Sequence, residues 1–396
     1  MKKFYLSCIV LFNCMISWAQ KPVGIESIAA NYYEPEWYGE QMNAWQKIVD
    51  ENPENQWAWR NLFRATHYYE LFTTGFKQVE DSKTAKVLRN MEQRHPDSFV
   101  LNLSKCKFSL PGDSSAETGQ CIYRAIDRMP EDATAEDINI IACRLWGVDS
   151  KNHKVDQLFT DVYKKGYYPE RILHYNWNLL QSMQPNALYF GNGDNITAPM
   201  RMLQAALDLR RDVTVIPLSF LFLQDFRDAL CEQLHIKPFP VKMDAYVERG
   251  AEWAKDFEGD FVMHLIKESK RPAYFFTDVL QQTNLNKDHL YNEGLLLKYS
   301  AKPYDNFAVA MHNVKSVYHL EYLTEPDLVY NTWQTSWRMD LNNVTLLAHL
   351  ISKLRKKGDE ITANRLYHTL DACVKVCRVQ PEFKAKIESI LKAEVQ

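Results

Sequence analysis

The stretch ALYFGNGDNITAPMRMLQAALDLRRDVTVIP, residues 187–217, decides the fold of the middle of the chain. Residues 187–190 form a short apolar run that ends in the glycine-rich loop 191–195. A helix with one apolar face is expected over residues 200–207, and the β-branched run 213–216 follows it. Strand, helix and strand in about 33 residues predict a βαβ unit, whose two strands are parallel.

The loop after the first strand is the best candidate for a binding site. Ligands of open parallel sheets bind beyond the carboxyl ends of the strands. The carboxylate of Asp194 repels phosphate, so it suits a sugar or ribose hydroxyl, or a cation. The alternative is structural, with Asp194 or Asn195 capping the next helix. Glu293 contributes only if the expected strands 273–276 and 295–299 neighbour the first. The candidate ligand-binding residues are Asn192, Gly193, Asp194, Asn195, Thr197 and Glu293.

Four segments in the same order carry a resemblance to a known family. They are Asn192-Gly193-Asp194-Asn195-x-Thr197-x-Pro199, Arg211-Asp212-Val213-x-Val215, Arg271-Pro272-x-Tyr274-Phe275 and Leu290-Tyr291-x-Glu293-Gly294-Leu295. Residues 180–310 thereby resemble the soluble domain of bacterial membrane proteins of the protein O-mannosyltransferase-like class. That family commonly has a second acid where Ile196 stands. The resemblance implies an accessory domain rather than glycosyl transfer, because the membrane helices of the family are missing here.

Helical hairpins are expected on both sides of this domain. Trp45 and Ile48 precede the turn Asn52-Pro53, and Trp59 and Leu62 continue the apolar spacing after it. This pattern resembles a tetratricopeptide repeat junction, and the resemblance covers residues 35–150 and recurs at 350–367. Such repeats stack to bury faces that a single hairpin leaves exposed, and their concave surface commonly binds protein.

Aromatic residues in and after the helical regions are candidates for holding a partner. Tryptophan beside arginine anchors protein partners or stacks on sugars, although tryptophans between two regions also pack them together. The candidate partner-binding residues are Trp59, Trp333, Trp337 and Arg338.

The N-terminus predicts export. Lys2 and Lys3 precede an almost wholly apolar run over residues 4–16, and Ser17-Trp18-Ala19 supplies small residues two apart. This pattern favours a signal peptide cleaved after Ala19, with lipidation at Cys14 or a retained anchor as alternatives. No later stretch is apolar enough to span a membrane. The protein is therefore expected in the periplasm or secreted.

Composition excludes other classes. A net charge of −3, from 47 Lys and Arg against 50 Asp and Glu, gives no basic excess for nucleic acid. No metal-ligand spacing or cofactor motif is present, so no metal and no cofactor are expected. The cysteines are interpreted as buried small hydrophobes, with a bridge within the first three as the alternative. After the signal they are Cys106, Cys121, Cys143, Cys231, Cys373 and Cys377.

The sequence thus predicts a mixed α and α/β protein, with helical-hairpin layers around a small parallel-sheet domain. The expected parts are a signal peptide over 1–19, repeat-like helices over 20–165, an α/β domain over 166–325 and repeat-like helices over 326–396. The leading hypothesis is a non-enzymatic envelope scaffold with a protein partner, such as a membrane protein of glycosylation or export. The alternative is a glycan- or small-molecule-binding protein, or a weak enzyme, that uses residues 191–195.

Overall fold

The computed structural model describes residues 21–75, 82–108, 116–277, 283–325, 333–376 and 381–393. The predicted signal peptide and Cys377 lie outside these ranges. Two compact units are present: one holds residues 21–25 and 33–96, and the other holds 26–32 and 97 onward. The domain boundaries expected at 165/166 and 325/326 both fall inside the second unit.

The first unit is a helical hairpin followed by a third helix. Its elements are α1 (Pro35–Glu51), α2 (Gln56–Thr74) and α3 (Lys83–Arg94). The Asn55 side chain caps α2 by accepting a hydrogen bond from Ala58 N at 3.1 Å. Trp45 and Trp59 are buried, and the Trp59 indole donates to Pro53 O at 2.8 Å. The predicted helix–turn–helix around Pro53 is therefore present, and Trp59 is part of its core.

The second unit begins with helices that precede the sheet. They are α4 (Phe99–Phe108), α5 (Ala116–Asp127), α6 (Ala135–Val148), α7 (His153–Lys164) and α8 (Glu170–Ser182). Thr134 caps α6, as its position before the apolar stripe of that helix predicts. Helix α7 packs against α9 (Thr197–Leu207), so this layer is joined to the α/β part.

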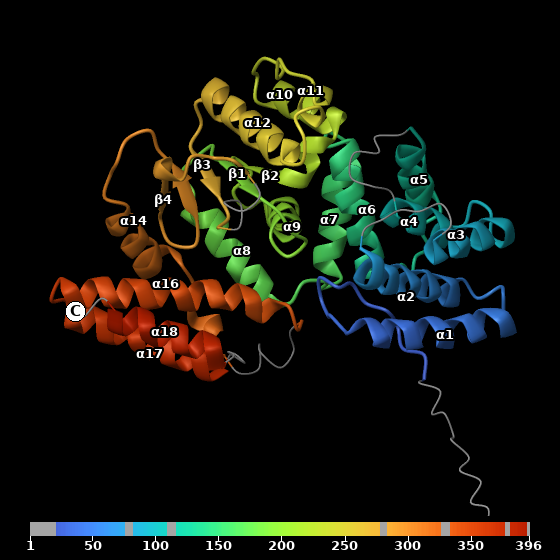
Figure 1. Ribbon diagram of the computed structural model, residues 1–396, viewed down its shortest axis with the longest axis horizontal. Coiled ribbons are helices and arrows are strands. Elements are labelled where there is room, and N and C mark those ends of the chain that lie inside the picture. The colour runs from blue at the N-terminus through green and yellow to red at the C-terminus, as the bar shows by residue number, and fades with distance from the viewer. Residues whose placement is uncertain are drawn as a thin grey trace, which may run out of the picture. The chain divides into compact units, whose positions relative to one another are not determined.

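The predicted βαβ unit is present. Strands β1 (Leu188–Gly191) and β2 (Thr214–Pro217) are parallel and are connected by α9. Strand β3 (Ala273–Phe275) pairs with β1 in parallel on its other side. Figure 1 shows these strands between α12 (Trp253–Ser269) on one side and α8 with α9 on the other. Helices α10 (Gln224–Gln233) and α11 (Asp244–Val247) lie between β2 and α12 in the chain.

The far half of the sheet corrects the prediction of a parallel sheet. Strands β4 (Leu290–Asn292) and β5 (Leu297–Tyr299) form a hairpin, and β5 runs antiparallel to β3. The order is β2-β1-β3-β5-β4, so the sheet is mixed. The connection from β4 to β5 is too short for a parallel crossover, which needs a dozen or more residues. Gly294 has a φ of 124°, which favours glycine in this reversal.

The described C-terminal part is helical, as predicted. After α14 (Asn306–His312), helices α16 (Ser336–Lys356) and α17 (Glu360–Val376) form a hairpin, and α18 (Pro381–Ala393) packs on α16. A buried ion pair joins this layer to α8, because Arg171 donates to Asp340 from Nε at 3.1 Å and from Nη2 at 2.6 Å. Figure 1 shows α16 alongside α8. No helix within the described ranges has the length and apolar character of a membrane span.

The cysteines that the structure describes are all free thiols, and all but the half-buried Cys143 are buried. They are Cys106, Cys121, Cys143, Cys231 and Cys373. The interpretation as small hydrophobes fits these positions, and the alternative bridge within the first three is not present.

Candidate functional site

The loop between β1 and α9 is held by its backbone. Gly193 has a φ of 104°, a conformation that favours glycine. Its carbonyl accepts hydrogen bonds from the main-chain N–H groups of Ile196 and Thr197, both at 3.1 Å. No side chain caps α9. The prediction that Asp194 or Asn195 caps this helix is therefore wrong.

Asn195 ties the loop to two distant segments. Its Nδ2 donates to Ala29 O at 2.9 Å and to Thr335 Oγ1 at 3.1 Å. Its Oδ1 is buried and accepts no hydrogen bond from any described residue. A buried acceptor without a donor costs free energy, so the contacts made by Nδ2 hold this side chain in place at some cost.

Asp194 is exposed, and its carboxylate has no hydrogen-bond or ion-pair partner within the described chain. Its main-chain carbonyl accepts from the hydroxyl of Tyr168 at 3.2 Å. Beside it, Asn192 Oδ1 accepts from Ser219 N at 3.2 Å, which links the loop to the turn after β2. The backbone of this loop is thus restrained while the carboxylate remains available.

These groups line a cavity of about 230 Å³ at the carboxyl ends of β1 and β2. Lys107 and Arg144 also line it, so two cationic side chains share the cavity with the carboxylate of Asp194. The cavity is smaller than the roughly 300–1,000 Å³ of sites for drug-sized ligands. A ligand about the size of a single sugar ring matches this space.

One wall of the cavity is aromatic. The ring of Trp333 lies 4.9 Å from that of Tyr167 and 5.4 Å from that of Tyr168, measured between centroids. All three residues line the cavity. Aromatic rings present an apolar face to the C–H groups of a ligand and leave hydroxyls to bond elsewhere.

The titratable groups of the cavity favour binding over nucleophilic chemistry. Burial, reinforced by the nearby Asp194 carboxylate, raises the pKa of the Cys143 thiol. Burial likewise raises the pKa of Tyr168 well above its ordinary value. Both groups therefore hold their protons at neutral pH, and a protonated thiol is a poor nucleophile. Within the described chain, no three His, Cys, Asp or Glu side chains gather as a metal site.

The structure brings most of the predicted site residues together. Those that line the cavity are Asn192, Gly193, Asp194, Asn195, Thr197 and Trp333. Glu293 is outside the lining. It is buried beside the β4–β5 turn, where it accepts from the Tyr304 hydroxyl at 2.6 Å and lies 3.5 Å from Lys298 Nζ. The side chains of Trp337 and Arg338 lie outside the described part of the structure.

The cationic residues and the tyrosines of this cavity were not predicted from the sequence. Lys107 and Arg144 come from α4 and α6, which looked like plain helical layers. The adjacent pair Tyr167-Tyr168, directly after Gly166, was a usable signal, because two aromatics in a short connection are unusual among polar turn residues. Comparisons with protein-family models, curated proteins and solved structures gave no match.

Proposed function

We propose that this chain is an exported binding protein for a small polyhydroxylated ligand, a single sugar ring of a glycan, held in the Asp194 cavity. The observation that carries the proposal is the exposed carboxylate of Asp194, a residue that lines this cavity, because its two oxygens lack a donor from the described chain. Adjacent hydroxyls of a sugar supply two donors at short separation. A phosphate would supply acceptors and would be repelled by the carboxylate.

The rest of the lining suits the same ligand class. Lys107 and Arg144 supply donors for ring or hydroxyl oxygens, and neither side chain accepts. Trp333 with Tyr167 and Tyr168 supplies the apolar wall. Thus acceptors, donors and a flat apolar face surround one space, which is the usual composition of a small-molecule site.

Saturation-transfer NMR with D-mannose, D-galactose and N-acetyl-D-glucosamine tests the proposal. We expect at least one of these sugars to bind the wild type, and Asp194→Asn to weaken that binding at least about tenfold. The reason is that a hydrogen bond to a charged group contributes about 1.5–3 kcal/mol. Asp208→Asn is the matched control: it makes the same substitution beyond the other end of α9, outside the cavity lining. Binding should then stay at the wild-type level.

Two results contradict the proposal. One is the absence of saturation transfer to all three sugars. The other is undiminished binding in Asp194→Asn with an unchanged melting temperature, which would place the ligand elsewhere. The hypothesis of a protein scaffold remains a prediction. Trp59, one of its candidate partner-binding residues, is buried and does not support it.

A further inference from the structure

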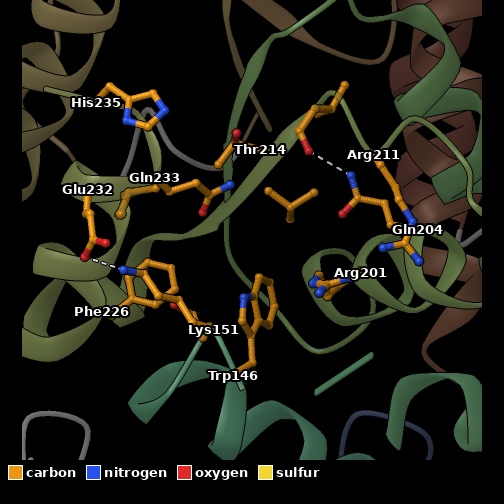
Figure 2. Close-up of a pocket in the computed structure, with 14 residues that line it drawn as sticks. Trp146, Lys151, Arg201, Gln204, Arg211, Thr214, Phe226, Glu232, Gln233 and His235 are labelled. Atoms are coloured by element: carbon orange, nitrogen blue, oxygen red, sulfur yellow. Dashed lines mark hydrogen bonds and ion pairs between the residues drawn. The ribbon is translucent and has the colours of Figure 1, made fainter. Parts of the chain in front are cut away.

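A second and larger cavity, of about 630 Å³, lies beside β2 in the same unit. Figure 2 shows Trp146 and Phe226 along one part of its lining and Arg201 with Arg211 on the other side. Helix α9 contributes to both cavities: Thr197 lines the Asp194 cavity, and Arg201, four residues on, lines this one. The function proposed above assigns no role to the residues that line this larger cavity, apart from Trp146, which lines both.

Strand β2 presents backbone groups to this cavity, because it is the edge strand of the sheet. Thr214 N donates to Ala187 O at 2.9 Å, so the backbone of Thr214 faces β1. Backbone groups alternate in direction along a strand, so the N–H and C=O of Val215 face outward, away from β1. Both Thr214 and Val215 line the cavity.

On either side of Val215, an outward-facing backbone group of this edge is already bonded or is missing. The Gln204 side chain donates to Val213 O at 2.8 Å, and Pro217 has no N–H to offer. Val215 is therefore left as one donor and one acceptor, with no partner strand on that side within the described chain. In a parallel addition to the sheet edge, this N–H and C=O pair with the C=O before and the N–H after one residue of an extended ligand.

Arg201 supplies a cation with unused donors. Its Nη2 forms an ion pair with Asp156, whereas its Nε and Nη1 have no partner among the described residues. Its side chain is only 18% exposed, and burial lowers its pKa although Asp156 opposes that effect. Because Nε and Nη1 still have N–H groups to donate, a second carboxylate in the cavity would form charge-assisted hydrogen bonds with Arg201.

Arg211 differs from Arg201 in having every nitrogen occupied. Its Nη1 pairs with Asp156 at 2.9 Å, its Nε with Asp208 at 2.5 Å, and its Nη2 donates to Ala205 O at 3.2 Å. On the opposite side of the cavity, Lys151 is paired with Glu232 (Figure 2). Arg201 is thus the cation best placed to receive an anionic group.

We propose that this cavity binds the carboxyl-terminal end of a short extended peptide. The N–H of Val215 donates to the C=O before one ligand residue, and the C=O of Val215 accepts from the N–H after that residue. The terminal carboxylate is held by Arg201. The last side chain packs against Trp146 and Phe226. The volume suits a di- or tripeptide. The peptide proposal does not rest on the sugar site, although Trp146 lines both cavities.

Isothermal titration with acetyl-Gly-Val-Leu tests the proposal, using the free acid and its carboxyl-terminal amide. We expect the wild type to bind the acid at least about tenfold more tightly than the amide, because a charge-assisted hydrogen bond is lost in the amide. Arg201→Gln should abolish this preference. Arg211→Gln removes the same charge from the same cavity and should retain the preference, because its donors are already used. The melting temperature of each variant shows whether it is folded.

Further ligands separate the parts of the proposal. An analogue with an ester in place of the Val-Leu peptide bond lacks one N–H and should bind at least about fivefold more weakly. Equal binding of acid and amide, or no binding of either, would overturn the peptide site. Inorganic phosphate that binds as tightly as the acid and competes with it would show a simple anion site, which also overturns the proposal.

Discussion

Asp340→Ala should lower the free energy of unfolding by about 3–5 kcal/mol, the cost of leaving a buried charge without its partner. Arg171 and Asp340 have side chains that are 2% and 3% exposed, so water does not replace the lost carboxylate. The guanidinium also donates from Nη1 to Tyr322 O at 2.7 Å, which fixes it in place. Chemical denaturation at neutral pH measures the loss.

Two controls distinguish burial from charge removal. Asp371→Ala breaks the exposed Lys375–Asp371 pair of α17 and should leave the denaturation midpoint unchanged. The double variant Arg171→Met with Asp340→Leu removes both buried charges and should recover much of the loss, because an apolar pair of similar volume avoids desolvation. A loss below about 1 kcal/mol in Asp340→Ala would show that α16 does not depend on this ion pair.

Glu258→Gln should stabilise the protein in a pH-dependent way. Glu258 lies on α12 at 6% exposure, and burial raises its pKa from 4.5 to about 7. No described residue forms a hydrogen bond or ion pair with it. The native state thus holds the proton to a higher pH than the unfolded state. The wild type therefore loses stability as the pH rises from about 4.5 through about 7, and the penalty is constant above that range.

Because glutamine does not ionise, the stability gained in Glu258→Gln depends on pH over the same range. We expect the gain in unfolding free energy to increase by up to about 3 kcal/mol between pH 4 and pH 8, since one pKa unit corresponds to about 1.36 kcal/mol. Denaturant titrations across this range measure it. Glu268→Gln, on the exposed side of the same helix, is the comparison for losing one carboxylate. A gain that is the same at pH 4 and pH 8 would contradict the burial of an ionisable Glu258.

Much of the fold followed from local patterns. The hairpin around Pro53 and the unit β1–α9–β2 were predicted because periodicity and turn residues act over a few positions. The position of the Asp194 loop followed from the same unit, since residues after parallel strands meet at one edge of the sheet. The antiparallel hairpin β4–β5 was not predicted, because three-residue strands carry too few residues to show their direction.

The amino-acid order alone was sufficient for the helices, the βαβ unit and the candidate loop, because these depend on neighbours in the chain. The cavity required the folded chain: Lys107, Arg144, Tyr168 and Trp333 come from segments far apart in sequence and meet only through packing. Likewise, only the folded structure shows that the Asp194 carboxylate is available to a ligand. Either Asp194 or Asn195 suited a helix cap by residue type, and the Gly193 carbonyl occupies that role instead. Local residue types favour several arrangements, and long-range contacts select one of them.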